Sequence, residues 1–239
     1  EVTSARWNRG RQAAEAVQEV RYFDLVLRRR TAAKPDPQAL SDCLAEAAAA
    51  DLDRALPLTD ELMTFFARAR FLKEHMPELD LPELGPESRR PLLEELCIGR
   101  RSFSDLKTVN LVQAFEQRLS FEQRTALGRH APMSLKVPSG SVKRLRYAAE
   151  GPPALSVRLQ EVFGLYESPR LAGGRVAVKM ELLAPNQRPV QVTQDLGSFW
   201  KNTYAEVRKE LRQRYPKHQW PEDPRDGIAS ARVLRRRKS

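Results

Sequence analysis

Basic side chains in the last fifth of the sequence recur at spacings that suit contacts with phosphate groups. Residues 196–213 have the pattern of one long helix, in which successive side chains are turned by 100°. Glu206 and Glu210 fall on one flank of the corresponding helical wheel. Because a merely solubilising helix more often mixes its signs, the segregation leaves the opposite, basic flank free to face nucleic-acid phosphates. The alternative is that the basic flank pairs with acidic residues elsewhere or faces water. The cations on the other flank are Lys201, Arg208 and Arg212.

A second basic group follows this segment directly. Its cations lie between Tyr215 and Trp220, and cations interleaved with aromatic rings can contact phosphates and stack on bases. The alternative is that both rings are buried against the domain and that the neighbouring prolines shape the segment. The candidate nucleic-acid-binding residues from both groups are Lys201, Arg208, Arg212, Arg214, Lys217 and His218.

Motifs for catalysis or metal binding are missing from the sequence. There is no phosphate-binding motif of the form G-x-x-x-x-G-K-[ST]. The histidines His75, His130 and His218 lie far apart, without Cys or carboxylate partners at metal-ligand spacing. Cys43 has no neighbouring group that would activate its thiol. We therefore expect no catalytic residue, no metal site and no cofactor in this chain, and no ATP hydrolysis by the chain alone.

The composition favours a globular protein with an anionic partner. Hydrophobic residues make up 41% and charged residues 30% of the chain. No run of 18 apolar residues occurs, which argues against a membrane span. The net charge is +10, and residues 201–239 hold twelve Lys and Arg against five Asp and Glu. Concentrated positive charge is typical of proteins that bind nucleic acid. Cys43 and Cys97 are expected to be buried free thiols, as in a cytoplasmic protein. The start at Glu1, without Met, indicates a piece of something longer.

Residues 35–130 read mostly as a helical array. Asp36 and Pro37 are typical of a helix start, and a second helix is expected from about Thr59 to just before Pro77. Pro86 is expected to open a third helix, which Gly99 would end. Ser120 and Gln123 are spaced as a capping box for a short helix that ends near Gly128. The apolar stripe of the second helix is Leu62, Phe65, Phe66, Ala69, Leu72 and Met76.

Strand patterns frame this helical region on both sides. The β-branched and aromatic residues within 13–30 indicate paired strands, although residues 10–20 alone could form a helix. After residue 132, strands are expected at 135–137, 142–147, 175–183 and 190–193. An amphipathic helix is expected at 154–163 and a long one at about 196–213. The fold class predicted for the whole chain is α+β.

Three stretches of the second half resemble the C-terminal region of the HrpB family of bacterial DEAH-box ATP-dependent RNA helicases. They are KVPSGSVKRLRY at 136–147, PALSVRLQEVFGLYESPRLAGGRV at 153–176, and a long stretch at 182–224. The third is the most specific, because RPVQVTQDL, FW, YAEVRKE, RYPKH and WPEDP occur in that order. The resemblance covers 132–224 strongly and 1–131 only through a general helical layout.

The resemblance implies a domain order and a set of partners. Residues 1–33 would be the end of an oligonucleotide-binding-fold-like barrel, 34–131 a helical domain and 132–224 the HrpB-type C-terminal α+β domain. Residues 225–239 would be a basic flexible tail. In the full-length protein ATP and Mg²⁺ would bind to two RecA-like motor domains upstream. The expected partners are these motor domains and nucleic acid, with RNA favoured, and no membrane.

Two hypotheses about function remain from the sequence. The chain is either an accessory region of a helicase that contacts nucleic acid, or a structural and partner-docking module that braces the motor without touching nucleic acid. Strong salt dependence of nucleic-acid binding would favour the first hypothesis.

Overall fold

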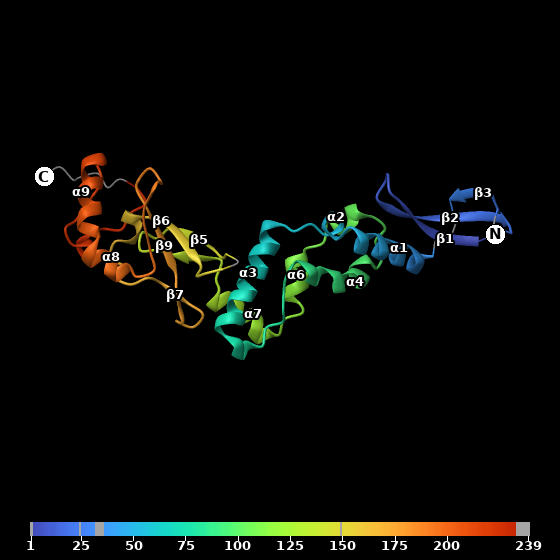
Figure 1. The fold of residues 1–239 in the computed structure, drawn as a ribbon, viewed down its shortest axis with the longest axis horizontal. Helices are drawn as coiled ribbons and strands as arrows, with labels where there is room; N and C mark the ends of the chain where they lie inside the picture. Colours follow the sequence, from blue (N-terminus) through green and yellow to red (C-terminus); the bar gives the residue numbers. More distant parts are fainter. Residues whose placement is uncertain (1, 24, 32–35, 149, 233–239) are drawn as a thin grey trace. The chain divides into compact units, whose positions relative to one another are not determined.

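The computed structural model describes residues 2–23, 25–31, 36–148 and 150–232. Its contacts divide the chain into two compact units. Unit 1 holds residues 1–66 and 83–118, and unit 2 holds residues 67–82 and 119–239. Helices and strands occur in both units (Figure 1), which confirms the predicted α+β class. The predicted domain boundaries after residues 33, 131 and 224 stay predictions.

An antiparallel sheet of three strands opens unit 1, in the order β1-β2-β3. The prediction of paired strands within 13–30 is confirmed, and the helical alternative for residues 10–20 is wrong. Trp7 packs against Phe103, with ring centroids 4.7 Å apart. Membership of this sheet in a barrel stays a prediction. The strands are β1 (Val2–Asn8), β2 (Ala13–Tyr22) and β3 (Leu25–Thr31).

The first two predicted helices begin where the sequence predicts. The Asp36 side chain accepts a hydrogen bond from the backbone N–H of Gln38 at 3.0 Å, and α1 starts at the next proline. The predicted second helix is α3, and its whole apolar stripe from Leu62 to Met76 is buried. Helix α3 (Asp60–His75) has residues 60–66 in unit 1 and residues 67–75 in unit 2. Further helices of unit 1 are α1 (Pro37–Ala50), α2 (Leu52–Ala55), α5 (Phe103–Leu106) and α6 (Leu111–Glu116).

The predicted third helix is only partly α-helical. It opens at Pro86 as the 3₁₀ helix η2 (Pro86–Leu92) and continues as the short helix α4 (Leu93–Cys97). Pro91 lies inside η2 and has no backbone N–H to donate, which disfavours a regular α-helix here. Gly99 follows at φ 72°, the left-handed conformation predicted for the end of this segment.

The helical part of unit 2 includes the predicted capping box. The backbone N–H of Gln123 donates to the Ser120 hydroxyl at 3.1 Å, and the Gln123 side chain accepts from the Ser120 N–H at 2.9 Å. Helix α7 (Phe121–His130) runs two residues past the predicted end at Gly128. The buried Arg68 guanidinium donates to the carbonyls of Leu127 and Ala131, and so caps the end of α7. The 3₁₀ helix η1 (Pro77–Leu79) follows α3 in the sequence.

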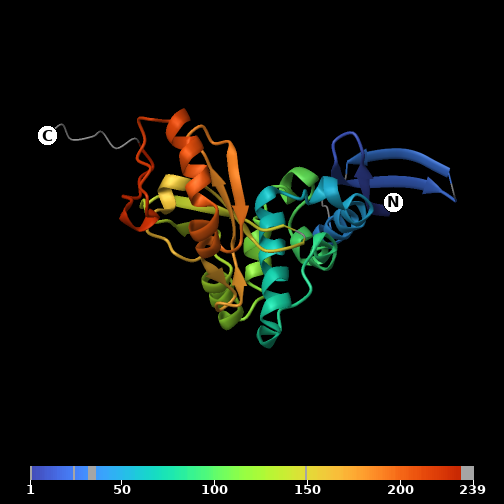
Figure 2. The ribbon, with the colours of Figure 1, turned by 60° about the vertical axis from the view of Figure 1, so that its left-hand side comes forward.

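A five-stranded sheet forms the core of unit 2, in the order β10-β9-β6-β5-β4 (Figures 1 and 2). Neighbouring strands are antiparallel except β6 and β9, which are parallel. The strands predicted at 135–137, 142–147 and 190–193 are confirmed. The five strands are β4 (Ser134–Lys136), β5 (Val142–Arg146), β6 (Ala154–Arg158), β9 (Lys179–Leu183) and β10 (Pro189–Thr193).

The prediction of an amphipathic helix at 154–163 is wrong. The segment is strand β6 followed by the 3₁₀ helix η3 (Leu159–Val162). Leu155, Leu159 and Val162 also fit the spacing of a helix, so the apolar pattern alone was ambiguous. The neighbours decide the outcome, because β6 lies between β5 and β9 and is largely buried.

Two long predicted elements are each broken in the structure. The strand predicted at 175–183 is divided into β8 (Val176–Ala177), which pairs with β7 (Arg170–Leu171), and β9. The helix predicted at 196–213 is divided at Thr203 into α8 (Leu196–Asn202) and α9 (Tyr204–Arg214).

The break at Thr203 has a packing cause. Phe199 and Tyr204 are five residues apart and would lie about 140° from each other on one continuous helix. Both are buried in the structure, with ring centroids 6.2 Å apart. The interruption lets both rings enter the same core.

The segment after α9 packs against other residues of unit 2, as far as the structure describes this segment. It contains the 3₁₀ helix η4 (Pro224–Asp226). The backbone N–H of Ser230 donates to the Gln160 carbonyl at 3.1 Å, and Arg158 donates to the Ala231 carbonyl at 3.0 Å. Of the tail predicted at 225–239, residues 233–239 lie outside the described residues, and residues 225–232 include these contacts.

Candidate nucleic-acid interface

Helices α8 and α9 carry four of the six predicted site residues. The carboxylate of Asp195 caps α8 by accepting from the Ser198 N–H at 2.8 Å. Tyr204 and Leu211 anchor α9 in the core, whereas Trp200 and Val207 are half-buried. The predicted buried face is therefore present on both helices. The wheel that joined Lys201 to the cations of α9 does not apply across Thr203.

The structure separates the three cations of the predicted flank. Lys201 on α8 and Arg212 on α9 are exposed and have no hydrogen-bond or ion-pair partner among the described residues. Arg208 is different, because its side chain is only 20% exposed. Its guanidinium donates to the Trp220 carbonyl and to the Glu222 carboxylate, each at 3.0 Å. Arg208 thus holds the segment after α9 in place.

The second basic group is also divided. Arg214 lies 3.6 Å from Glu210, one helical turn earlier, and both side chains are largely exposed. Lys217 is exposed, and its side chain has no hydrogen-bond or ion-pair partner within the described part of the chain. Nδ1 of His218 lies 2.9 Å from the Gln160 side-chain oxygen. Burial, and then the nearby Arg158 charge, lower the pKa of His218 below its ordinary value. Both effects favour the neutral ring.

The aromatic rings beside these cations are packed. Trp220 is buried, and its indole N–H donates to the Tyr215 carbonyl at 2.9 Å. Tyr215 is half-buried and lies edge-on to the His218 ring. This arrangement favours the alternative in which the two rings belong to the core, and it leaves phosphate contact as the chemistry open to the exposed cations.

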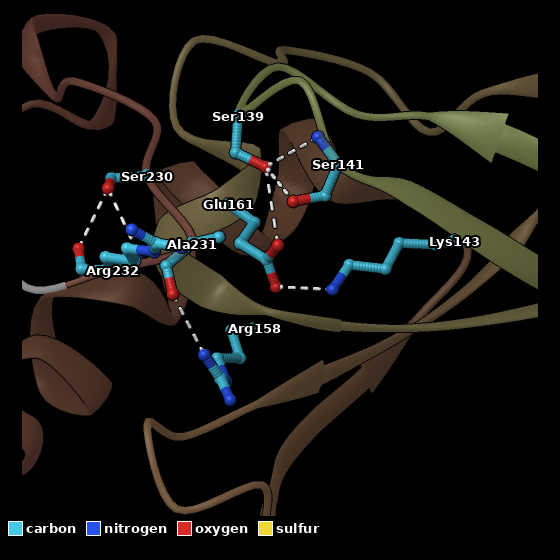
Figure 3. A network of polar contacts seen from close by, with 8 residues as sticks. All are labelled: Ser139, Ser141, Lys143, Arg158, Glu161, Ser230, Ala231 and Arg232. Carbon is cyan, nitrogen blue, oxygen red and sulfur yellow. Dashed lines mark hydrogen bonds and ion pairs between the residues drawn. The ribbon is translucent and has the colours of Figure 1, made fainter.

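A buried carboxylate elsewhere in unit 2 has a structural role (Figure 3). Glu161 is fully buried, and its Oε2 lies 2.8 Å from Nζ of Lys143. The Ser139 hydroxyl donates to the other carboxylate oxygen at 3.3 Å. Burial raises the pKa of Glu161, but hydrogen bonds from Lys143 and Ser141 outweigh it and the net shift is downward. No contact joins Ser139 to Lys143 within the described residues, so both side chains are linked only through the Glu161 carboxylate.

Neither a metal site nor a membrane-spanning helix occurs in the described ranges. No group of three or more His, Cys, Asp or Glu residues there could hold a metal ion. No helix there is long and apolar enough to cross a bilayer.

Cations that the sequence reasoning did not select lie on the sheet of unit 2. Their signal in the sequence was the alternation of charged and apolar residues along β5 and β9. Which of them share a face depends on strand register, which the sequence did not specify. They are Lys136, Arg144, Arg146 and Lys179.

Comparison with known proteins gives consistent findings. The HrpB C-terminal family, described as "ATP-dependent helicase C-terminal", matches residues 92–224. The protein named "ATP-dependent RNA helicase HrpB" of Escherichia coli (strain K12) is 34% identical over 234 residues, which are 96% of this chain and 29% of that protein. The likeness therefore extends well into residues 1–131, where the sequence alone indicated only a general layout.

Two solved structures have the same fold over most of the chain. The crystal structure of E. coli DExH-box NTPase HrpB is similar at a TM-score of 0.79 and 33% identity, over 96% of this chain and 29% of that one. The crystal structure of Escherichia coli DEAH/RHA helicase HrpB gives 0.68 and 33%, over 91% and 28%. The chain thus spans less than a third of the length of these relatives.

Proposed function

Because the chain belongs to the ATP-dependent helicase C-terminal family, we propose that it is an accessory region that contacts nucleic acid and braces a helicase motor. RNA is the proposed nucleic acid, since the E. coli relative is named an RNA helicase. ATP and Mg²⁺ would bind to motor domains outside this chain, because the sequence holds no phosphate-binding motif.

The observation that carries this proposal is a set of exposed cations without acidic partners in a chain of net charge +10. Lys201, Arg212 and Lys217 have no ion-pair partner among the described residues. Phosphate contacts from lysine and arginine supply most of the affinity of sequence-independent binding. Arg214 is proposed as a further contact, since its pairing with Glu210 is long and exposed.

Arg208 and His218 have a different place in this proposal. Arg208 donates to Trp220 in the segment 214–222, and His218, within that segment, contacts Gln160, so both have partners within unit 2. We propose that they position the exposed cations around them, and that Arg208 reaches phosphate only at the cost of its bonds to residues 220–222.

Equilibrium binding of the purified chain to labelled single-stranded RNAs tests the proposal. Several RNAs of unrelated sequence would be compared by fluorescence anisotropy at about 50 and 200 mM salt. We expect similar affinities for all sequences, because phosphate contacts carry no sequence information, and weaker binding at the higher salt. Absence of binding at the lower salt would contradict nucleic-acid contact by this chain.

A second candidate function is docking to protein without contact to nucleic acid. It is favoured by exposed apolar side chains at one end of the β2–β3 hairpin, where the Tyr22 and Phe23 rings lie edge to face at 4.9 Å. Exposed apolar clusters often mark protein contacts. This candidate becomes the better account if the RNA experiment finds no binding. The exposed residues are Tyr22, Phe23, Val26 and Leu27.

A further inference from the structure

The five-stranded sheet of unit 2 has one apolar face and one polar face. Leu145, Leu155 and Met180 are cross-strand partners, and all three are buried. Successive side chains in a strand point to opposite faces, so the next row lies on the other side of the sheet. That row consists of Arg146, Ala154 and Lys179.

Four cations of the polar face form a group that we call the basic face. Arg158 at the end of β6 is a further cation in the outward rows, but it donates to the Ala231 carbonyl and is not counted in the group. Arg144 and Arg146 are two positions apart on β5, so they share one face of the strand at a spacing of about 7 Å. Lys136 is the cross-strand partner of Val142, which lies on the same face as Arg144. Lys179 on β9 is in the same row as Arg146, with the small Ala154 of β6 between them. Lys136, Arg144 and Arg146 are exposed and Lys179 is half-exposed. The basic face consists of Lys136, Arg144, Arg146 and Lys179.

One acidic residue lies among these cations and fixes one of them. Glu181 forms an ion pair with Arg146 and accepts a hydrogen bond from the Ser156 hydroxyl. The Ser156 hydrogen bond, followed by Arg146 and nearby Lys179, lowers the pKa of Glu181. Four positive charges against one negative charge leave an excess of three on this face. Arg146 is held in place, and a ligand loses less side-chain entropy on contacting a fixed cation.

The exposed side of α9 provides a contrast within the same unit. There Glu206, Lys209, Glu210 and Arg212 mix both signs along the helix. Charges of one sign on a shared face add to the local potential, whereas mixed signs cancel. The basic face is therefore the better attractor for a polyanion.

We propose that the basic face binds the phosphate backbone of a nucleic-acid strand. This inference rests on the proposed function and adds a site outside α8 and α9. Among the described residues, no aromatic side chain belongs to the outward rows of β4, β5, β6, β9 or β10. Base stacking is therefore not part of the contact, and binding here is independent of sequence.

Three charge-matched variants of the chain test the proposal with single-stranded RNA. The first replaces Lys136, Arg144 and Lys179 with Ala and keeps the pair of Arg146 with Glu181. The second, K201A/R212A/K217A, replaces exposed cations of α8, α9 and the segment after α9. The third, R9A/K107A/R129A, removes three exposed cations that belong to neither group. Each variant loses three positive charges, so the effects of net charge are equal.

The basic-face variant is expected to bind RNA roughly tenfold or more weakly at about 0.1 M salt. Its slope of log affinity against log salt is expected to become shallower by about 2, which is about 0.7 for each lost contact on a single strand. The third variant is expected to keep the slope within about 0.5 of the unmodified chain. If the basic-face variant behaves like the third variant while the second loses slope, the basic face is not the site and the proposed function stands. If the unmodified chain does not bind at all, both fail.

A footprint on the unmodified chain tests the same site without any substitution. Single-stranded RNA is expected to slow the acetylation of Lys136 and Lys179 severalfold, and to leave exposed Lys107 unaffected. Equal rates with and without RNA at both residues, under conditions where RNA is bound, would overturn the proposal.

Discussion

The guanidinium of Arg208 donates a hydrogen bond of 3.0 Å to the backbone carbonyl of Trp220. A side chain that the sequence placed on a phosphate-facing flank is thus committed to the fold. We predict that Arg208→Ala lowers the free energy of unfolding by about 1–3 kcal/mol, because the carbonyl loses a charged donor. Urea denaturation followed by circular dichroism measures this change.

Arg212, one turn further along α9, is the matched control. It is exposed and without a partner among the described residues, so Arg212→Ala should change the free energy of unfolding by less than about 0.5 kcal/mol. Equal effects of the two substitutions would show that the bond from Arg208 to Trp220 contributes nothing to stability.

His218 should make stability depend on pH. Burial and the Arg158 charge lower its pKa in the folded state, so the unfolded chain binds the proton more readily. This contribution is present above the ordinary pKa of 6.5 and is lost as the pH falls through the folded-state pKa. We predict that the free energy of unfolding falls more steeply on acidification for the unmodified chain than for His218→Gln.

Denaturation curves at several pH values between about 7.5 and 5 would show this difference. The comparison with His218→Gln removes the contribution of the carboxylates, which titrate in both proteins. Parallel pH profiles would contradict the lowered pKa, and so would a histidine resonance that titrates above the ordinary value.

Gly227 leaves no room for a side chain. A Cβ at this position would lie 2.7 Å from Cγ of the buried Phe163, although the backbone φ of −77° suits any residue. We predict that Gly227→Ala loosens residues 227–232 and lowers the free energy of unfolding by about 1–3 kcal/mol. Trypsin should then cleave after Arg225, whereas in the unmodified chain it should first remove only residues beyond Arg232.

Gly128 offers the control within the same unit. It lies in α7 with open space around the position of a Cβ, so Gly128→Ala should raise the free energy of unfolding by up to about 1 kcal/mol. A Gly227→Ala protein with the proteolysis pattern of the unmodified chain would show that the segment accommodates the methyl group.

Local signals in the sequence predicted several helix boundaries well. The Asp36 cap, the box of Ser120 with Gln123 and the left-handed Gly99 all depend on residues close in the chain, and each is present in the structure. The apolar stripe of α3 was equally clear, because its period matches one helix only.

Elements whose form depends on distant partners were predicted less well. Strand β6 was taken for a helix, since its neighbours β5 and β9 are what make it a strand. The break at Thr203 depends on where Phe199 and Tyr204 pack. The candidate site was affected in the same way. The bond from Arg208 to Trp220 and the grouping of Arg146 with Lys179 are contacts of tertiary structure, which a wheel drawn on one segment does not include.

The dependence of RNA affinity on salt tests nucleic-acid contact by this chain most directly. Binding of a single-stranded RNA to the unmodified chain would be measured across about 50–200 mM salt. Each phosphate contact on a single strand contributes about −0.7 to the slope of log affinity against log salt. With three or more contacts, we predict a slope of about −2 or steeper. A slope near zero, or no binding at the lowest salt, would contradict the account and leave protein docking as the function of this region.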